Sequence, residues 1–141
     1  MSNLTVTGYA AVFGNVDSVN DVIVRGAFRK ALKVCQNMPL LYSHKNDEPI
    51  GRILKAEEDW YGLWVTLEVF EEIAKGKDVI ALHRGGMRLG LSIGYRAMKY
   101  RTVRKEATDA RFLEELSLIE ISVVTNPAND MAMICEKRKK K

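Results

Sequence analysis

The sequence has little histidine and little cysteine, and it contains no apolar run long enough to span a membrane. Two histidines, His44 and His83, and two cysteines, Cys35 and Cys135, occur in 141 residues. The cysteines match no metal-ligand spacing and no redox motif, which argues against a zinc site and against a dithiol redox centre. The N-terminus also lacks the apolar core of a signal peptide. We therefore expect a cytoplasmic protein that needs no metal and no cofactor.

The composition that remains is that of an ordinary globular domain, with 47% hydrophobic and 28% charged residues. The net charge of +4 has a local origin, because residues 137–141 are all Lys or Arg. We expect residues 1–130 to form one domain and residues 131–141 to form a polar, Lys-rich, disordered tail. A contact between this tail and a polyanion or an acidic partner is the alternative.

Short apolar segments with period-two alternation predict a mainly β protein with inserted helices, of the α+β class. Strands are predicted over residues 4–13, 38–44, 50–56, 61–70, about 87–101 and 112–125. Helical spacing is found over residues 26–35, with Cys35 on the apolar stripe, and over residues 71–84. Residues 102–110 form a charged connection. This order predicts a mostly antiparallel barrel of six or seven strands, and it disfavours a doubly wound parallel sheet.

The candidate nucleophile is Ser92, which lies in the G-x-S-x-G pattern of residues 90–94. No histidine follows Ser92, so the triad order of the α/β-hydrolases is excluded. On a strand, Gly90, Ser92 and Gly94 share one face. The two glycines can leave a trough above the hydroxyl for an extended peptide, or they can mark a bulge or close packing of another segment. The sequence alone leaves both interpretations open.

The candidate base and the candidate acid come from two other strands. His44 ends the strand 38–44 beside a loop, whereas His83 lies in the last turn of a predicted helix, where a cation is ordinary. Glu120 lies in a strand whose two faces are largely apolar, and a buried carboxylate requires a partner. A histidine imidazole is one suitable partner, and Lys or Arg is another. Glu114 and Glu115 compete for the same role.

Four segments of the chain match a known pattern in order and spacing, and together they span nearly all of it. They are residues 8–28, 40–51, 90–95 and 120–129. With these segments the sequence resembles the prohead (capsid maturation) proteases of tailed bacteriophages, which are related in fold to the herpesvirus assemblin proteases. The resemblance implies a herpesvirus-protease-like barrel. It also implies that Ser92 is the nucleophile, that His44 is the general base and that Glu120 is the third member, a position occupied by histidine in the herpesvirus enzymes.

The same resemblance implies a serine endopeptidase that cleaves capsid precursor and scaffolding protein, and itself, inside the assembling prohead in the host cytoplasm. It further implies a homodimer or higher oligomer. Two alternatives from other classes remain at this stage. One is a catalytically silent assembly or scaffolding protein of the same fold, and the other is a small basic barrel that binds nucleic acid. No strand interleaves aromatic residues with Lys or Arg, which disfavours the nucleic-acid alternative.

Overall fold

The structure, a computed structural model, describes residues 2–34, 38–105, 108–127 and 129–141. Cys35 lies outside the described residues, so the prediction of its burial has no counterpart here. The strands and helices are β1 (Leu4–Val12), β2 (Asp21–Ile23), the 3₁₀ turn η1 (Ala31–Lys33), β3 (Pro39–Tyr42), β4 (Lys45–Glu58), β5 (Gly62–Val69), α1 (Ala74–Arg84), β6 (Gly90–Lys105) and β7 (Thr108–Val124). None of the helices in this described part is long and apolar enough to cross a membrane.

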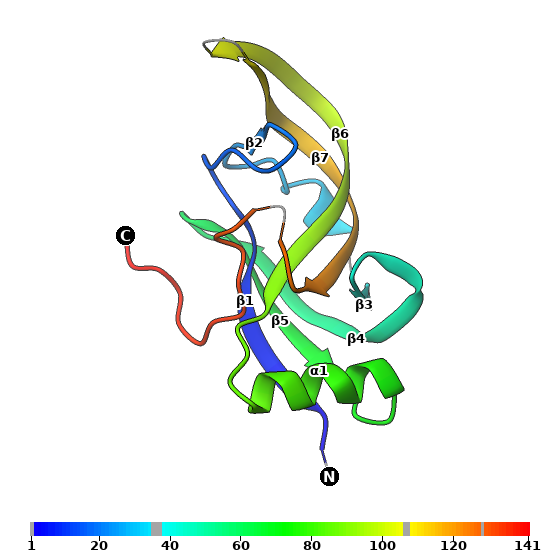
Figure 1. Ribbon diagram of the computed structural model, residues 1–141. Helices are drawn as coiled ribbons and strands as arrows, with labels where there is room; N and C mark the ends of the chain where they lie inside the picture. Colours follow the sequence, from blue (N-terminus) through cyan, green and yellow to red (C-terminus); the bar gives the residue numbers. More distant parts are fainter. Residues whose placement is uncertain (1, 35–37, 106–107, 128) are drawn as a thin grey trace.

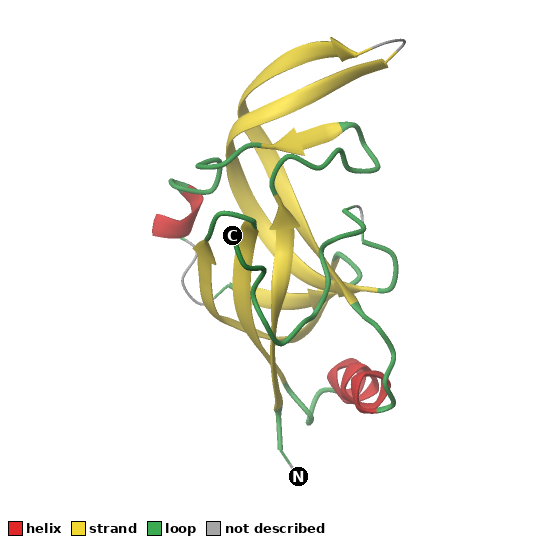
Figure 2. Ribbon diagram, turned by 90° about the vertical axis from the view of Figure 1, so that its left-hand side faces the viewer, coloured by secondary structure: helices red, strands yellow, loops and turns green. Residues whose placement is uncertain are grey.

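The strands form one curled sheet, as Figure 1 shows, in the order β1-β5-β4-β3-β7-β2, with β6 paired to β7. Most neighbours are antiparallel, and β2 and β3 both pair in parallel with β7. The predicted alternation in β5 is correct, since Leu63, Val65, Leu67 and Val69 are buried. Helix α1 lies at the end of the molecule near the N-terminus (Figures 1 and 2). The predicted fold class, a mainly β protein with mostly antiparallel strands, is confirmed.

Two predictions about local structure are wrong. Residues 26–35 were expected to form a helix, but the described part of this segment consists of turns and the short η1. Gly26 has a φ of 92°, and the amides of Gly26 and Phe28 donate to the Glu58 carboxylate at 3.1 and 3.0 Å. These bonds attach the turn at residues 26–28 to the end of β4, while Phe28 still packs in the core.

The charged segment 102–110 was expected to be a connection, but its described residues extend the β6–β7 hairpin. Thr102, Arg104, Thr108 and Asp109 of this extension are exposed, and Arg104 pairs with Asp109 across the strands at 3.7 Å. The short strand β2 was not predicted. Three residues carry too little alternation to be recognised in a sequence.

The segment after β7 fills the space between β1 and the start of β6. We call residues 132–139 the C-terminal strap. Its backbone accepts from Leu91 N at Ala132 O (2.8 Å) and from Tyr9 N at Met133 O (3.3 Å). The strap backbone also donates, from Ile134 N to Leu89 O and from Cys135 N to Thr7 O. The expected domain boundary at residue 130 remains a prediction.

Candidate functional site

His44 lies in the tight turn that joins β3 to β4. Tyr42 pairs with Lys45, and the two residues between them, Ser43 and His44, have φ values of 52° and 61°. Two left-handed residues in a two-residue loop are the signature of a type I′ hairpin turn. This backbone conformation is unfavourable for residues other than Gly, Asn and Asp, so contacts with the rest of the protein must stabilise the turn. Ser43 N donates to Val123 O at 2.9 Å, which attaches the turn to β7.

The imidazole of His44 contacts the carboxylate of Glu120 on β7. His44 Nδ1 lies against Glu120 Oε1, and because a carboxylate only accepts, Nδ1 carries the proton. The second oxygen, Oε2, accepts from Ser122 Oγ at 2.5 Å. Ser122 Oγ in turn accepts from His44 N at 3.0 Å. Glu120 is buried, whereas the His44 side chain is about half exposed, so the ring joins an interior carboxylate to the surface.

Ser92 lies on β6, on the opposite side of β7 from His44. It pairs directly with Ser122, and Gly94 pairs with Glu120. Side chains of antiparallel partners point to the same face, so Ser92 shares a face with Ser122 and Glu120. Among the described residues no direct hydrogen bond joins Ser92 to His44. The structure therefore brings His44 and Glu120 into contact and sets Ser92 one strand away on the same face.

The glycines beside Ser92 make room for neighbouring side chains. A Cβ at Gly94 would lie 2.5 Å from Oε1 and 2.9 Å from Cγ of Glu120. A Cβ at Gly90 would lie 2.7 Å from Cδ of Pro127. At both positions a neighbouring side chain, Glu120 or Pro127, takes up the room that a Cβ would need. The substrate trough above Ser92 remains a prediction. Gly94 in particular leaves the space through which Glu120 reaches His44.

We expect Gly94→Ala to displace the Glu120 carboxylate and to reduce peptide cleavage about 100-fold or more, since misplacement by about 1 Å can cost this much. The Nδ1 proton resonance of His44 in an NMR spectrum should shift in the same variant. Gly85→Ala is the control, because Gly85 caps α1 and has a φ of −76° that alanine adopts readily. A Gly94→Ala variant that cleaves like the wild type, with an unchanged Nδ1 resonance, would show that Glu120 needs no such clearance.

The other candidate residues lie away from this pair. Glu115 forms ion pairs with Lys30 at 3.2 Å and Lys99 at 3.9 Å, and Glu114 is exposed. His83 lies in the last turn of α1, as predicted. Sequence analysis gave Ser122 no role, although its spacing of two from Glu120 along a strand was the available signal.

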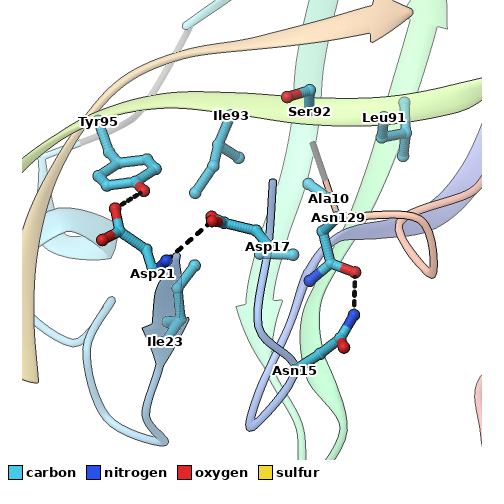
Figure 3. A pocket seen from close by; sticks show the side chains of 11 residues that line it. Ala10, Asn15, Asp17, Asp21, Ile23, Leu91, Ser92, Ile93, Tyr95 and Asn129 are labelled. Atoms are coloured by element: carbon cyan, nitrogen blue, oxygen red, sulfur yellow. Dashed lines mark hydrogen bonds between the residues drawn. The ribbon is translucent and has the colours of Figure 1, made fainter. Parts of the chain in front are cut away.

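A pocket beside β6 contains polar residues to which sequence analysis gave no role in a site. In Figure 3, Ile93 and Tyr95 point from β6 toward Asp17 and Asp21, while the Ser92 side chain lies on the other side of the strand. Arg111 donates twice to Asp21, at 2.8 and 2.9 Å, and the Tyr95 hydroxyl also donates to it. Burial raises the pKa of Asp21, but the bonds from Arg111 and Tyr95 outweigh it and lower the pKa overall. This cluster ties β2 to both long strands.

Within the described ranges, no group of three or more His, Cys, Asp or Glu side chains has the arrangement of a metal site.

The chain matches the family described as Caudovirus prohead serine protease over residues 1–141. The protein belongs to this family. The resemblance identified from the four sequence segments is thus confirmed.

Relatives of this prohead protease family include the prohead proteases of Enterobacteria phage HK97 and Escherichia phage T5. The first is 35% identical over 131 residues, covering 90% of this chain and 57% of the relative. The second is 28% identical over 127 residues, covering 88% of this chain and 58% of the relative. The chain therefore spans less than two thirds of the length of these two relatives.

The fold also resembles solved protease structures. The bacteriophage T4 capsid assembly protease superimposes with a TM-score of 0.69 at 15% identity, covering 89% of this chain and 84% of the other. The KSHV protease, solved with a hexapeptide phosphonate inhibitor, superimposes with a TM-score of 0.56 at 11% identity, covering 94% of this chain and 64% of the other. At these identities the likeness establishes the fold, and it confirms the herpesvirus-protease-like architecture.

Proposed function

We propose that this prohead protease family member is a serine endopeptidase in which Ser92 is the nucleophile, His44 the general base and Glu120 the residue that orients His44. The observation that carries the proposal is the contact between His44 Nδ1 and the buried Glu120 carboxylate, on the face that also bears Ser92. A carboxylate bound at Nδ1 leaves Nε2 unprotonated. Nε2 is the nitrogen that serves the serine in the best-known triads.

The proposed reaction has two stages. Ser92 Oγ attacks the carbonyl of the peptide bond while His44 Nε2 takes the hydroxyl proton, and His44 then gives this proton to the leaving amine. A water molecule then attacks the acyl-enzyme while His44 Nε2 takes a proton from it. His44 gives this proton to Ser92 Oγ as the ester bond breaks, which releases the new carboxyl end and restores Ser92. Glu120 stays ionised throughout and stabilises the imidazolium that forms in each stage.

Ser122 supports Glu120 in this scheme. Its hydroxyl donates to Glu120 Oε2 and accepts from the His44 backbone amide, so one side chain fixes both the carboxylate and the turn that carries the histidine. Because Ser122 is completely buried, this hydroxyl is a positioning group and is unsuited to attack a substrate.

The proposed substrates are capsid precursor and scaffolding proteins, and the chain itself, cleaved inside an assembling prohead in the host cytoplasm. The names of the relatives from HK97 and T5, prohead proteases, support this assignment. By resemblance to the herpesvirus enzymes we also propose that the protein self-associates. The scheme needs no cofactor, because each of its proton transfers is made by His44.

A fluorophosphonate probe tests the enzyme class independently of the substrate. Such a probe loses fluoride to a nucleophilic serine and leaves a phosphonate on its oxygen. We expect covalent labelling at Ser92, located by peptide mass spectrometry, and a strong loss of labelling in His44→Ala because the hydroxyl then lacks its base. A folded protein that takes up no probe, or that is labelled equally well without His44, would favour a catalytically silent assembly protein of the same fold.

A further inference from the structure

A second, smaller apolar cluster lies apart from the main core. Tyr9 and Val12 of β1 and Trp64 of β5 are buried there, with Tyr61 and Cys135 packed against them. The ring of Tyr9 lies 4.8 Å from that of Tyr61 and 4.9 Å from that of Trp64, centroid to centroid. Alternation along β5 turns Trp64 away from the main core, so the residue is buried only because another segment covers it. The C-terminal strap contributes to this cover through Cys135.

Two carboxylates border this cluster. Asp59 Oδ1 accepts from the amides of Tyr61 and Gly62 at 2.8 and 3.0 Å, and Oδ2 accepts from the Tyr9 hydroxyl at 2.6 Å. Burial and the hydrogen bond to Asp59 raise the pKa of Tyr9 to about 12, so its hydroxyl is a neutral donor at physiological pH. Glu57 lies two residues before Asp59 near the end of β4. We call the set Tyr9, Glu57, Asp59, Trp60, Tyr61 and Trp64 the acidic–aromatic cradle.

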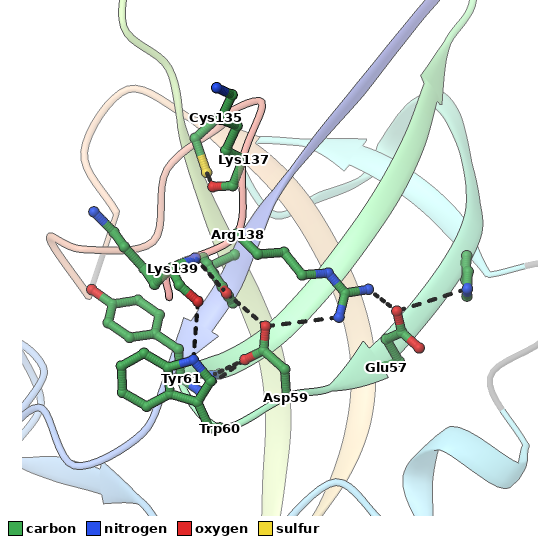
Figure 4. Close-up of polar contacts among 11 residues, drawn as sticks. Glu57, Asp59, Trp60, Tyr61, Cys135, Lys137, Arg138 and Lys139 are labelled. Atoms are coloured by element: carbon green, nitrogen blue, oxygen red, sulfur yellow. Dashed lines mark hydrogen bonds and ion pairs between the residues drawn. The ribbon is translucent and has the colours of Figure 1, made fainter. Parts of the chain in front are cut away.

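Arg138 and Lys139 of the strap occupy the cradle, as Figure 4 shows. The Arg138 guanidinium pairs with Glu57, lies 3.9 Å from Asp59 and stacks 5.2 Å from the centre of the Trp64 ring.

The contacts of Lys139 complete the arrangement. Its amide donates to the Tyr9 hydroxyl at 3.1 Å, and its carbonyl accepts from Trp60 Nε1 at 3.0 Å. Its ammonium group lies 6.0 Å from the centre of the Tyr61 ring. The two residues thus meet the cradle through charge, ring faces and backbone together.

From these contacts we propose that the acidic–aromatic cradle is a binding site for an Arg-Lys segment, and that Arg138 and Lys139 of the same chain occupy it as a latch on the C-terminal strap. An aromatic face favours a cation, and a planar guanidinium suits a carboxylate and a ring at once. The bonds from the Lys139 backbone to Tyr9 and Trp60 fix the position of the segment along the cradle, whereas a solvated basic tail would have no fixed position.

The latch bears on the strand of Ser92 because the strap connects the two. Ala132 O accepts from the amide of Leu91, the residue directly before Ser92. On the opposite edge, Met133 O accepts from Tyr9 N, and a Cβ at Gly8 would lie 2.5 Å from the same oxygen. The strap thus fits closely between β1 and β6. Release of the latch should loosen the start of β6 and lower the rate of cleavage; this last step rests on the proposed function.

The two tryptophans of the chain are both members of the cradle, so their fluorescence reports the latch directly. In the full chain, Arg138→Ala should shift the emission maximum to longer wavelength and increase quenching by acrylamide, which is uncharged. Amide exchange at Leu91 should become faster, and cleavage should slow severalfold. Lys140→Ala is the matched control, since it removes the same charge from an exposed neighbour. Raised salt screens the ion pairs of Arg138 with Glu57 and Asp59, so it should shift the fluorescence of the wild type in the same direction as Arg138→Ala does.

A peptide with the sequence of residues 136–141 tests the site itself. Added to the Arg138→Ala chain, it should reverse the fluorescence shift, and the same peptide with alanine for Arg138 should not. Equal spectra for Arg138→Ala, Lys140→Ala and the wild type would overturn the latch. A shift that the peptide cannot reverse would overturn the binding site. Because fluorescence and exchange do not depend on turnover, an inactive wild-type chain would refute the proposed function while leaving the latch supported by these readouts.

Discussion

Ser92→Ala is expected to abolish peptide cleavage, with a loss of roughly 10⁶-fold in kcat, the size found when a triad serine is removed elsewhere. The substitution removes one oxygen from the buried Ser92 side chain and adds no atom, so the fold should survive. Cleavage of a capsid precursor, followed by gel electrophoresis and mass spectrometry, measures the loss. Circular dichroism and thermal unfolding verify that the variant is folded.

Ser117→Ala is the matched control, because Ser117 is an exposed serine on β7. It should cleave the precursor like the wild type. Processing of the precursor by a pure Ser92→Ala chain would remove Ser92 from the nucleophile role.

Glu120→Gln should reduce cleavage by about 10⁴-fold while leaving a small, measurable activity. The side-chain amide introduced by this substitution can donate to His44 Nδ1, which then holds the wrong tautomer and leaves the protonated nitrogen facing the serine. Cleavage of a capsid precursor measures the loss, and circular dichroism with thermal unfolding separates this effect from a general loss of folding.

Glu115→Gln provides the comparison for Glu120→Gln. Glu115 pairs with Lys30 and Lys99 at the surface, and exposed ion pairs are worth about 0–1 kcal/mol, so neither activity nor stability should change much. The opposite pattern, a fully active Glu120→Gln and an inactive Glu115→Gln, would mean that the orienting carboxylate has been assigned to the wrong residue.

The sequence predicted the strands well because burial of one face imposes an alternation that can be read directly, as in Leu63, Val65, Leu67 and Val69 of β5. A buried carboxylate that needs a partner left histidine, Lys and Arg all open for Glu120, and only the family resemblance pointed to His44. Residues 26–35 were wrongly predicted to be helical because Phe28 and Ala31 are buried as on a helix face, whereas the positive φ of Gly26 and the bonds to Glu58 belong to a turn. A local pattern contains no information about a carboxylate 30 residues away.

The docking of Arg138 and Lys139 was hidden for a similar reason. A run of basic residues is ordinarily solvated, and the sequence does not reveal that Glu57 of β4, Asp59 of the β4–β5 turn and Trp64 of β5 meet it. The roles of Ser122 and Gly94 depend on the register between β6 and β7, which pairs Ser92 with Ser122 and Gly94 with Glu120. Register is a tertiary property, set by turns and by the whole buried face.

The pairing of β7 has a consequence for the order in which the chain can fold. Along one edge β7 joins β2 at residues 111–113 and β3 at residues 121–123, so it needs partners from the first third of the sequence. His44 and Glu120 are 76 residues apart. Closing such long loops costs entropy before any contact compensates it, and proteins rich in distant pairings fold slowly. The β3–β4–β5 meander can form early from local contacts, whereas the histidine and its carboxylate meet only after β7 has been made and inserted.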